Sequence, residues 1–243
     1  MTKNGITVLS LFDGMSCGQI AMRELGIKID KYYASEIDKH AIKQTQLNFP
    51  DTIQLGSVTE VDARKLGHVD ILIGGSPCTN FSFAGRRNGM NTTTNEEIYT
   101  LERYLQLKSE GFSFDGESFL FWEYMRILGE LRETNPDVFF FLENVEMGDK
   151  WETVLTKAIG IPGVHINSAL VSAQNRRRIY WTNIRTKTEG LFNWVVPDIP
   201  QPEDRDIMLA DVLEDEVDGK YYLKDEVVDK LLANGVKGAE GSV

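Results

Sequence analysis

The chain has 243 residues, 42% of them hydrophobic and 26% charged, which is typical of one sizeable soluble α/β domain with or without a small appendage. No apolar run approaches bilayer length, and the first residues lack the apolar core of a signal peptide, so we expect a cytoplasmic protein. Two cysteines, Cys17 and Cys78, exclude a disulfide framework, and three histidines isolated in the sequence offer no metal-ligand spacing.

Acidic residues are concentrated late in the chain. The formal net charge is −11, and residues 198–230, with twelve acids and four bases, account for −8 of it. The remainder carries compact basic clusters, Arg86-Arg87 and Arg176-Arg177-Arg178, of the kind that contacts phosphates. The net charge therefore does not exclude nucleic acid as a partner. We expect one domain over residues 1–196, followed by an acidic segment over residues 197–243.

The first strand-to-helix turn is a candidate ligand site. An apolar run over residues 7–12 predicts a buried strand, and Asp13-Gly-Met-Ser-Cys-Gly18 leads into a helix predicted over residues 19–25. Such a glycine-containing turn admits a ligand close to helix N–H groups, although many of these turns serve only packing.

Glu36 ends the second predicted strand, residues 32–35. In dinucleotide-binding folds an acid about twenty residues after the glycine turn holds a ribose hydroxyl. We therefore interpret Glu36 as a ribose ligand. A solvated carboxylate at a strand end is the alternative. A helix follows over residues 38–48, with Asp38 as its N-terminal cap, and a third strand is predicted over residues 53–58.

A short apolar run over residues 69–73 predicts a buried parallel strand that ends in Gly74-Gly-Ser-Pro-Cys78. Ligands bind beyond the carboxyl ends of the strands in open α/β sheets, so Cys78 is placed at the expected cleft. An ordinary buried cysteine is the alternative interpretation.

The remaining elements complete an α/β fold with a doubly wound, mostly parallel sheet. We expect helices over residues 96–108, 119–131 and 150–159, and strands over residues 138–142, 164–171 and 178–183. Strand 138–142 ends in Glu143-Asn144, so Glu143 and Cys78 should face one cleft. The basic segment Gln174–Arg178 belongs to this cleft or forms a hairpin that faces solvent.

Five segments in order resemble the cytosine-5 DNA methyltransferases: Phe12-Asp-Gly-Met-Ser-Cys-Gly18, Glu36, Gly75-Ser-Pro-Cys-Thr-Asn-Phe-Ser82, Glu143-Asn-Val145 and Gln174-x-Arg-x-Arg178. The motif style is closest to the de novo animal-type branch, and we expect a bacterial or phage member. The resemblance implies the class I S-adenosylmethionine-dependent, Rossmann-like fold. It also implies methylation of double-stranded DNA, as in restriction-modification.

The resemblance also implies roles for individual residues. Cys78 would attack carbon 6 of a flipped-out cytosine, and Glu143 would hold or protonate ring N3. Arg176 and Arg178 would contact the base and hold the active-site groups, while Asn144 would brace the loop that carries Cys78. The implied S-adenosylmethionine site consists of Phe12, Asp13, Gly14, Ser16, Gly18, Glu36, Ile37, Val58, Pro77 and Leu120.

The sequence also departs from the family pattern. Family members usually have an acid after Gly56 to hold the adenine amino group, whereas this chain has Ser57. A target-recognition domain of normal size and a closing motif are not found. The acidic segment could begin an incomplete target-recognition region that a second chain or a missing part would supply. An RNA cytosine methyltransferase of the same fold and a non-catalytic regulatory subunit remain alternatives.

Overall fold

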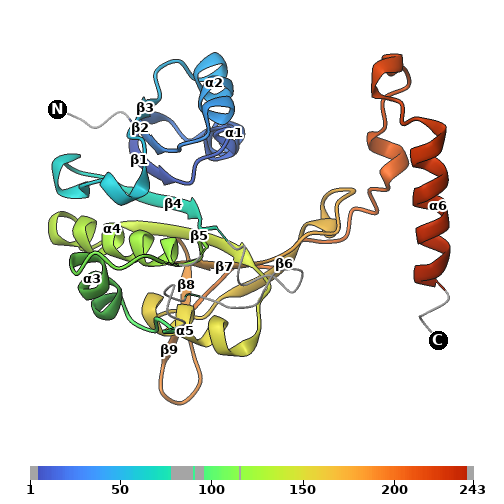
Figure 1. Cartoon of the computed structure of the whole chain (residues 1–243). Coiled ribbons are helices and arrows are strands. Elements are labelled where there is room, and N and C mark those ends of the chain that lie inside the picture. Colours follow the sequence, from blue (N-terminus) through green and yellow to red (C-terminus); the bar gives the residue numbers. More distant parts are fainter. Residues whose placement is uncertain (1–4, 78–89, 91–95, 115, 240–243) are drawn as a thin grey trace.

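The computed structural model describes residues 5–77, 90, 96–114 and 116–239. Its centre is a seven-stranded sheet in the order β3-β2-β1-β4-β5-β7-β6 (Figure 1). The strands are β1 Ile6–Leu11, β2 Ile29–Ser35, β3 Ile53–Gln54, β4 Ile71–Gly75, β5 Phe139–Val145, β6 Val164–Asn167 and β7 Arg177–Thr182. Strands β1 to β5 are parallel, and β7 is antiparallel to both of its neighbours. The expected doubly wound, mostly parallel sheet is confirmed.

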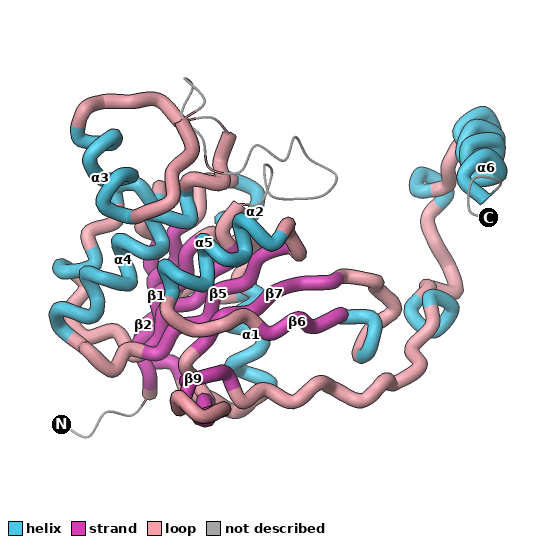
Figure 2. Tube along the Cα trace, turned by 90° about the horizontal axis from the view of Figure 1, so that it is seen from below, coloured by secondary structure: helices cyan, strands magenta, loops and turns pink. Residues whose placement is uncertain are grey.

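Helices cover both faces of the sheet. The main core packs α3, α4 and α5 against alternate residues of the central strands, and a smaller cluster packs α1 against β1 and β2 (Figure 2). The helices are α1 Cys17–Glu24, α2 Lys39–Asn48, α3 Leu101–Ser109, α4 Leu120–Thr134, α5 Asp149–Ile159 and α6 Asp225–Ala239. None of the helices within the described ranges is long and apolar enough to cross a membrane.

The strand order places a topological switch between β1 and β4. After β1 the chain continues to β2 on one side, whereas β4 continues to β5 on the other. The loops that leave β1 and β4 therefore diverge and open a crevice at the carboxyl ends of the strands, which is where open α/β sheets bind ligands. Both the glycine turn and the segment leading to Cys78 leave the sheet at this point.

Three predicted elements are shorter than expected because side chains and glycine redirect the backbone. Strand β3 has two residues, since Gly56 adopts a φ of +76° and Ser57 caps a 3₁₀ turn, η1 Val58–Glu60. Strand β6 ends where Asn167 caps another 3₁₀ turn, η3 Ser168–Leu170. Helix α3 begins only at Leu101, because Thr100 accepts a hydrogen bond from a first-turn N–H.

The predicted N-terminal cap of α2 is confirmed. Asp38 caps α2, and its Oδ1 accepts hydrogen bonds from the backbone N–H groups of His40 and Ala41, both at 2.8 Å. The sequence did not predict a hairpin formed by β8 Thr186–Glu189 and β9 Trp194–Pro197. The 3₁₀ turn η2 Ala63–Lys65 was also not predicted, and two further 3₁₀ turns, η4 Leu209–Val212 and η5 Gly219–Tyr221, lie in the acidic segment.

The carboxyl-terminal segment leaves the sheet after the hairpin. Within the described part of the chain, its last backbone hydrogen bond to the sheet domain runs from Arg205 N to Leu170 O at 2.9 Å. Every residue over 208–233 is exposed, and α6 stands apart from the sheet in Figure 1. The division at residue 197 remains a prediction.

His165 is expected to make stability depend on pH. Its ring lies between Glu152 at 3.0 Å and Glu146 at 3.4 Å. Partial burial lowers the pKa of His165, but the interactions with Glu152 and then Glu146 outweigh burial and raise it above 6.5. This stabilisation is present below the unfolded-state pKa and is lost as pH rises through the folded-state pKa.

We therefore expect His165→Gln to lower the melting temperature at pH 6 and to have little effect at pH 8.5. The side chain is half exposed, so the contribution should stay below about 1 kcal/mol. Thermal denaturation at the two pH values measures the difference between wild type and variant. A difference that is the same at both pH values would contradict the proposed ion pairs.

Candidate active site

The turn after β1 contains three residues in the left-handed region: Phe12 with φ +56°, Gly14 with φ +58° and Ser16 with φ +60°. For Phe12 and Ser16 this conformation costs on the order of 1 kcal/mol or more each. Hydrogen bonds hold the turn. Asp13 accepts one from the Ser16 hydroxyl and another from the Tyr32 hydroxyl, the latter at 2.7 Å. Strain of this kind is typical of sites that must present the backbone to a ligand.

Gly18 allows α1 to pack closely on the sheet. A Cβ at this position would lie 2.5 Å from Ile73 Cδ1 and 3.0 Å from the Tyr32 hydroxyl. The absence of a side chain therefore lets the helix approach the strand ends. Gly18, which was assigned to the cofactor, therefore also has a role in packing α1 against the sheet.

Glu36 ties the second strand to the glycine turn. Its Oε2 accepts a hydrogen bond from Gly14 N at 2.8 Å, and Oε1 accepts from Ile37 N at 2.7 Å and Asp38 N at 2.9 Å. A carboxylate has about four acceptor positions, so one remains for a hydroxyl donor. The carboxylate is thus fixed in position and still able to bind a ligand.

A cavity of about 220 Å³ opens beside Glu36. The residues that line it end or follow β2, follow β1, β3 and β4, or lie at the start of α4: Phe12, Ser35, Glu36, Ile37, Gly56, Ser57, Val58, Pro77, Glu117 and Leu120. Six of these residues were assigned to the cofactor from the sequence: Phe12, Glu36, Ile37, Val58, Pro77 and Leu120. Ser35, Gly56 and Glu117 were missed, although Ser35 and Gly56 follow strands at the same sheet edge.

The other assigned residues lie around this cavity. Asp13 and Gly18 line a second cavity of about 370 Å³, which shares Phe12 with the first and reaches Glu143. Gly14 contacts Glu36, and Ser16 is fully buried beneath the turn. The two cavities together connect the glycine turn with the end of β5.

Glu143 lies directly beside Gly75, because β4 and β5 are parallel and these two residues are paired in the register. Two arginines face its carboxylate. Arg178 Nε lies 2.7 Å from Glu143 Oε1, and Arg176 Nη2 lies 3.5 Å from the same oxygen. The Arg178 contact is an ion pair without well-aligned hydrogen-bond geometry. The three groups together carry a net positive charge at the mouth of the crevice.

Asn144 reaches from β5 to the segment that leads to Cys78. It is almost fully buried, and its Nδ2 donates hydrogen bonds to Ser76 Oγ at 2.9 Å and Ser76 O at 3.2 Å. Cys78 itself, the rest of its motif to Ser82, and Arg86-Arg87 lie outside the described residues. The backbone two residues before Cys78 is thus attached to the strand that carries Glu143.

Comparison with known proteins identifies the family. Residues 6–153, more than half of the chain, match the family described as C-5 cytosine-specific DNA methylase. The chain belongs to this family. The match includes the glycine turn, Glu36, the Cys78 motif and Glu143-Asn144. Arg176 and Arg178 lie beyond it.

The chain is similar to proteins from phages and bacteria. The chain is 30% identical to the orphan methyltransferase M.Rho11sI of Bacillus phage rho11s, over 98% of this chain and 49% of that protein. It is 29% identical to the type II methyltransferase M1.ScrFI of Lactococcus lactis subsp. cremoris, over 91% of this chain and 52% of the relative. The chain spans about half the length of these relatives.

A solved structure supports the fold. The crystal structure of the S. pombe Dnmt2 methyltransferase aligns with a TM-score of 0.58 over 93% of this chain and 65% of that chain, at 16% identity. At this identity the likeness concerns the fold alone. It agrees with the mostly parallel sheet described above.

Gly75 is expected to be essential for the position of Glu143. A Cβ at Gly75 would lie 2.8 Å from Glu143 Oε2, so Gly75→Ala should push the carboxylate away from the crevice. We expect methyl transfer to fall about tenfold to a hundredfold, within the range attributed to one acid–base group, with a melting temperature close to wild type.

The matched control is Gly148→Ala, just after β5, where a Cβ would meet nothing within 4 Å. The assay follows tritiated methyl transfer to duplex DNA, alongside thermal denaturation of both variants. Equal activities of the two variants would show that the contact between Gly75 and Glu143 is unimportant.

Proposed function

We propose that this methylase transfers a methyl group from S-adenosylmethionine to carbon 5 of a flipped-out cytosine in double-stranded DNA, through a covalent adduct at Cys78. The observation that carries this proposal is the pairing of Gly75 with Glu143 between β4 and β5. It sets the segment leading to Cys78 beside a carboxylate faced by two arginines, and both residues line the second cavity, which shares Phe12 with the cavity beside Glu36.

The cavity has the chemistry that S-adenosylmethionine needs. Glu36 retains an acceptor position for a ribose hydroxyl, and Ile37, Val58 and Leu120 offer apolar surface for the adenine and the methionine chain. Among the residues that the structure describes, none has an atom within 4 Å of a Cβ added at Gly14, so a ligand can approach the turn closely. When bound, S-adenosylmethionine supplies an electrophilic methyl group.

The protein's residues would activate the cytosine. The Cys78 thiolate forms a bond to carbon 6, and the electron pair of the ring double bond becomes available at carbon 5. Glu143 stabilises this form through ring N3, and Arg178 and Arg176 hold Glu143 and contact the base. After methylation, a solvent base accepts the carbon-5 proton, the double bond between carbons 5 and 6 re-forms, and the bond to the Cys78 sulfur breaks to release the thiolate. Asn144 acts by holding Ser76.

The partner and the cellular setting are proposed from the relatives. The family's description names DNA, and the relatives are orphan and type II methyltransferases of phages and bacteria. We propose that the chain acts in the cytoplasm of a bacterial or phage-infected cell. Because it spans about half of those relatives, we further propose that target recognition requires a second chain or further sequence. In that arrangement residues 197–243 would begin the recognition region.

Covalent trapping tests the proposal. The chain is incubated with S-adenosylmethionine and duplex DNA that contains 5-fluorocytosine, and a denaturation-resistant adduct is sought by gel electrophoresis and mass spectrometry. Fluorine cannot leave as a proton, so the reaction should stop with Cys78 bound to carbon 6. The two cysteines provide a matched pair, because Cys78→Ser should abolish the adduct whereas Cys17→Ser should retain it.

The alternatives give different results. An adduct with cytosine-containing tRNA and none with duplex DNA would indicate an RNA methyltransferase. Binding of S-adenosylhomocysteine without any adduct would indicate a non-catalytic module or a requirement for the rest of the recognition region. An adduct that persists in Cys78→Ser would disprove the nucleophile.

Ser57 offers a gain-of-affinity prediction. It lines the cavity where the family usually has an acid, and Ser57→Asp would provide an acceptor for the adenine amino group. One such hydrogen bond contributes about 1 kcal/mol, so S-adenosylhomocysteine should bind about fivefold more tightly. Isothermal titration calorimetry measures the affinity for S-adenosylhomocysteine, with Ser57→Asn as an uncharged control of similar size. Weaker binding by the Asp variant would place the adenine elsewhere.

A further inference from the structure

One wall of the cavity is formed by the connector between β3 and β4. This connector has little regular structure besides the 3₁₀ turns η1 and η2, so its own backbone does not fix its position. Val58 lines the cavity, and its carbonyl accepts a hydrogen bond from Arg126 Nη2 at 3.1 Å. Arg126 Nη1 also donates to Val61 O at 2.9 Å. One guanidinium of α4 thus holds both ends of η1.

Two buried carboxylates hold Arg126 in turn. Glu123 Oε2 accepts from Arg126 Nε at 2.7 Å, and Glu130 Oε1 accepts from Nη1 at 2.6 Å. Glu123 is completely buried and Glu130 is 5% exposed. Glu130 also accepts a hydrogen bond from Ala63 N at 2.9 Å. Burying a charge costs free energy unless the charge is paired and hydrogen-bonded. Glu123, Arg126 and Glu130 are therefore expected to keep these contacts in the folded chain.

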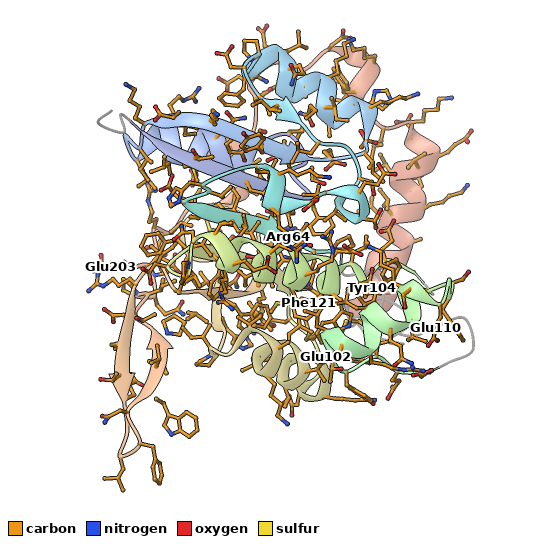
Figure 3. The ribbon with its side chains drawn as sticks, turned by 90° about the vertical axis from the view of Figure 1, so that its left-hand side faces the viewer. Arg64, Glu102, Tyr104, Glu110, Phe121 and Glu203 are labelled. Carbon is orange, nitrogen blue, oxygen red and sulfur yellow. The ribbon has the colours of Figure 1, made fainter. Side chains whose placement is uncertain are left out.

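Helix α3 adds a second attachment. The Tyr104 hydroxyl and the Lys108 ammonium both donate hydrogen bonds to Glu123. Lys108 also donates to Thr59 O at 3.3 Å. Figure 3 looks towards this side of the molecule, with Arg64 labelled near α4 and Tyr104 on α3. Side chains of α4 and α3 therefore hold the connector that forms this wall of the cavity.

Helix α4 contributes to the cavity directly as well. It begins at Leu120, which lines the same cavity as Val58, and Arg126 follows less than two turns later. We propose that Arg126 is a positioning residue for the S-adenosylmethionine site, which sets the distance between the Val58 wall and the Leu120 wall without touching the ligand. This inference rests on the proposed function.

The test compares two attachments of the same connector to α4. Arg126→Lys retains a positive charge between Glu123 and Glu130 but loses the planar fork that reaches both carbonyls. Glu133→Gln is the matched control, because it removes the exposed ion pair between Glu133 of α4 and Arg64 of the connector at 2.8 Å and leaves the contact of Arg64 with Glu130 in place. Lys108→Met removes the hydrogen bond to Thr59 O and the ion pair with Glu123. This variant provides a second test in case Arg126→Lys does not fold.

Affinity for S-adenosylhomocysteine, measured by calorimetry, should fall about tenfold in Arg126→Lys and about threefold in Lys108→Met, and stay at the wild-type value in Glu133→Gln. Hydrogen exchange should accelerate in residues 57–63 without acceleration in β1 or α1. A purely structural role would instead raise exchange throughout the domain. The KM for S-adenosylmethionine should rise while kcat at saturation stays unchanged.

Failures of the two proposals are distinguishable. Wild-type affinity in both Arg126→Lys and Lys108→Met overturns the positioning role, whether or not DNA is methylated. Loss of affinity in Glu133→Gln equal to that in Arg126→Lys also overturns it. If the wild-type chain binds S-adenosylhomocysteine but forms no adduct with fluorinated DNA, the base chemistry fails and the affinities still decide the role of Arg126. If the wild-type chain does not bind S-adenosylhomocysteine, both the positioning role and the proposed function are overturned.

Discussion

The parallel pairing of β4 with β5 is the constraint on which the candidate site depends. It sets Gly75 beside Glu143, and the absence of a Cβ at Gly75 leaves space for that carboxylate. A one-residue change of register would turn Glu143 to the opposite face of the sheet. The apolar side chains of β5 that enter the main core hold this register, so burial on one side of the strand determines the chemistry at its end.

The second requirement is a cavity built from segments far apart in the chain. Glu36 attaches β2 to the glycine turn, while Arg126 attaches the connector to α4. In both cases a charged side chain satisfies backbone groups that a regular strand or helix would have satisfied itself. The strained turn at Phe12 and Ser16 depends on such support, because isolated residues in this conformation would relax.

Much of the fold could be predicted from the sequence because its strongest signals are local. Apolar runs gave the central strands, and Asp38 identified the start of α2. The end of β3 could not be predicted in this way, because the backbone of Gly56 turns left-handed and Ser57 then caps a 3₁₀ turn. The tie between Arg126 and Val58 joins residues 68 positions apart, and no periodicity indicates such a contact.

For the site, six of the residues that line the cavity were assigned to the cofactor: Glu36 from its place about twenty residues after the glycine turn, and the other five from the family resemblance. Glu117 was missed because it lies in an irregular stretch with no pattern of its own. The roles assigned to Cys78, Glu143 and the arginines depend on the family resemblance. The structure adds to them a geometric relation between Glu143, Arg176 and Arg178.

Charge distribution bears on the proposed DNA partner. A net charge of −11 would repel a polyanion if it were spread evenly, but residues 198–230 carry −8 of it. These residues belong to the segment that leads away from the sheet in Figure 1. Exposed charges further apart than about 8 Å are largely screened at physiological ionic strength. Close to the end of β5, two guanidinium groups face one carboxylate, and arginines of this kind can contact a phosphate backbone.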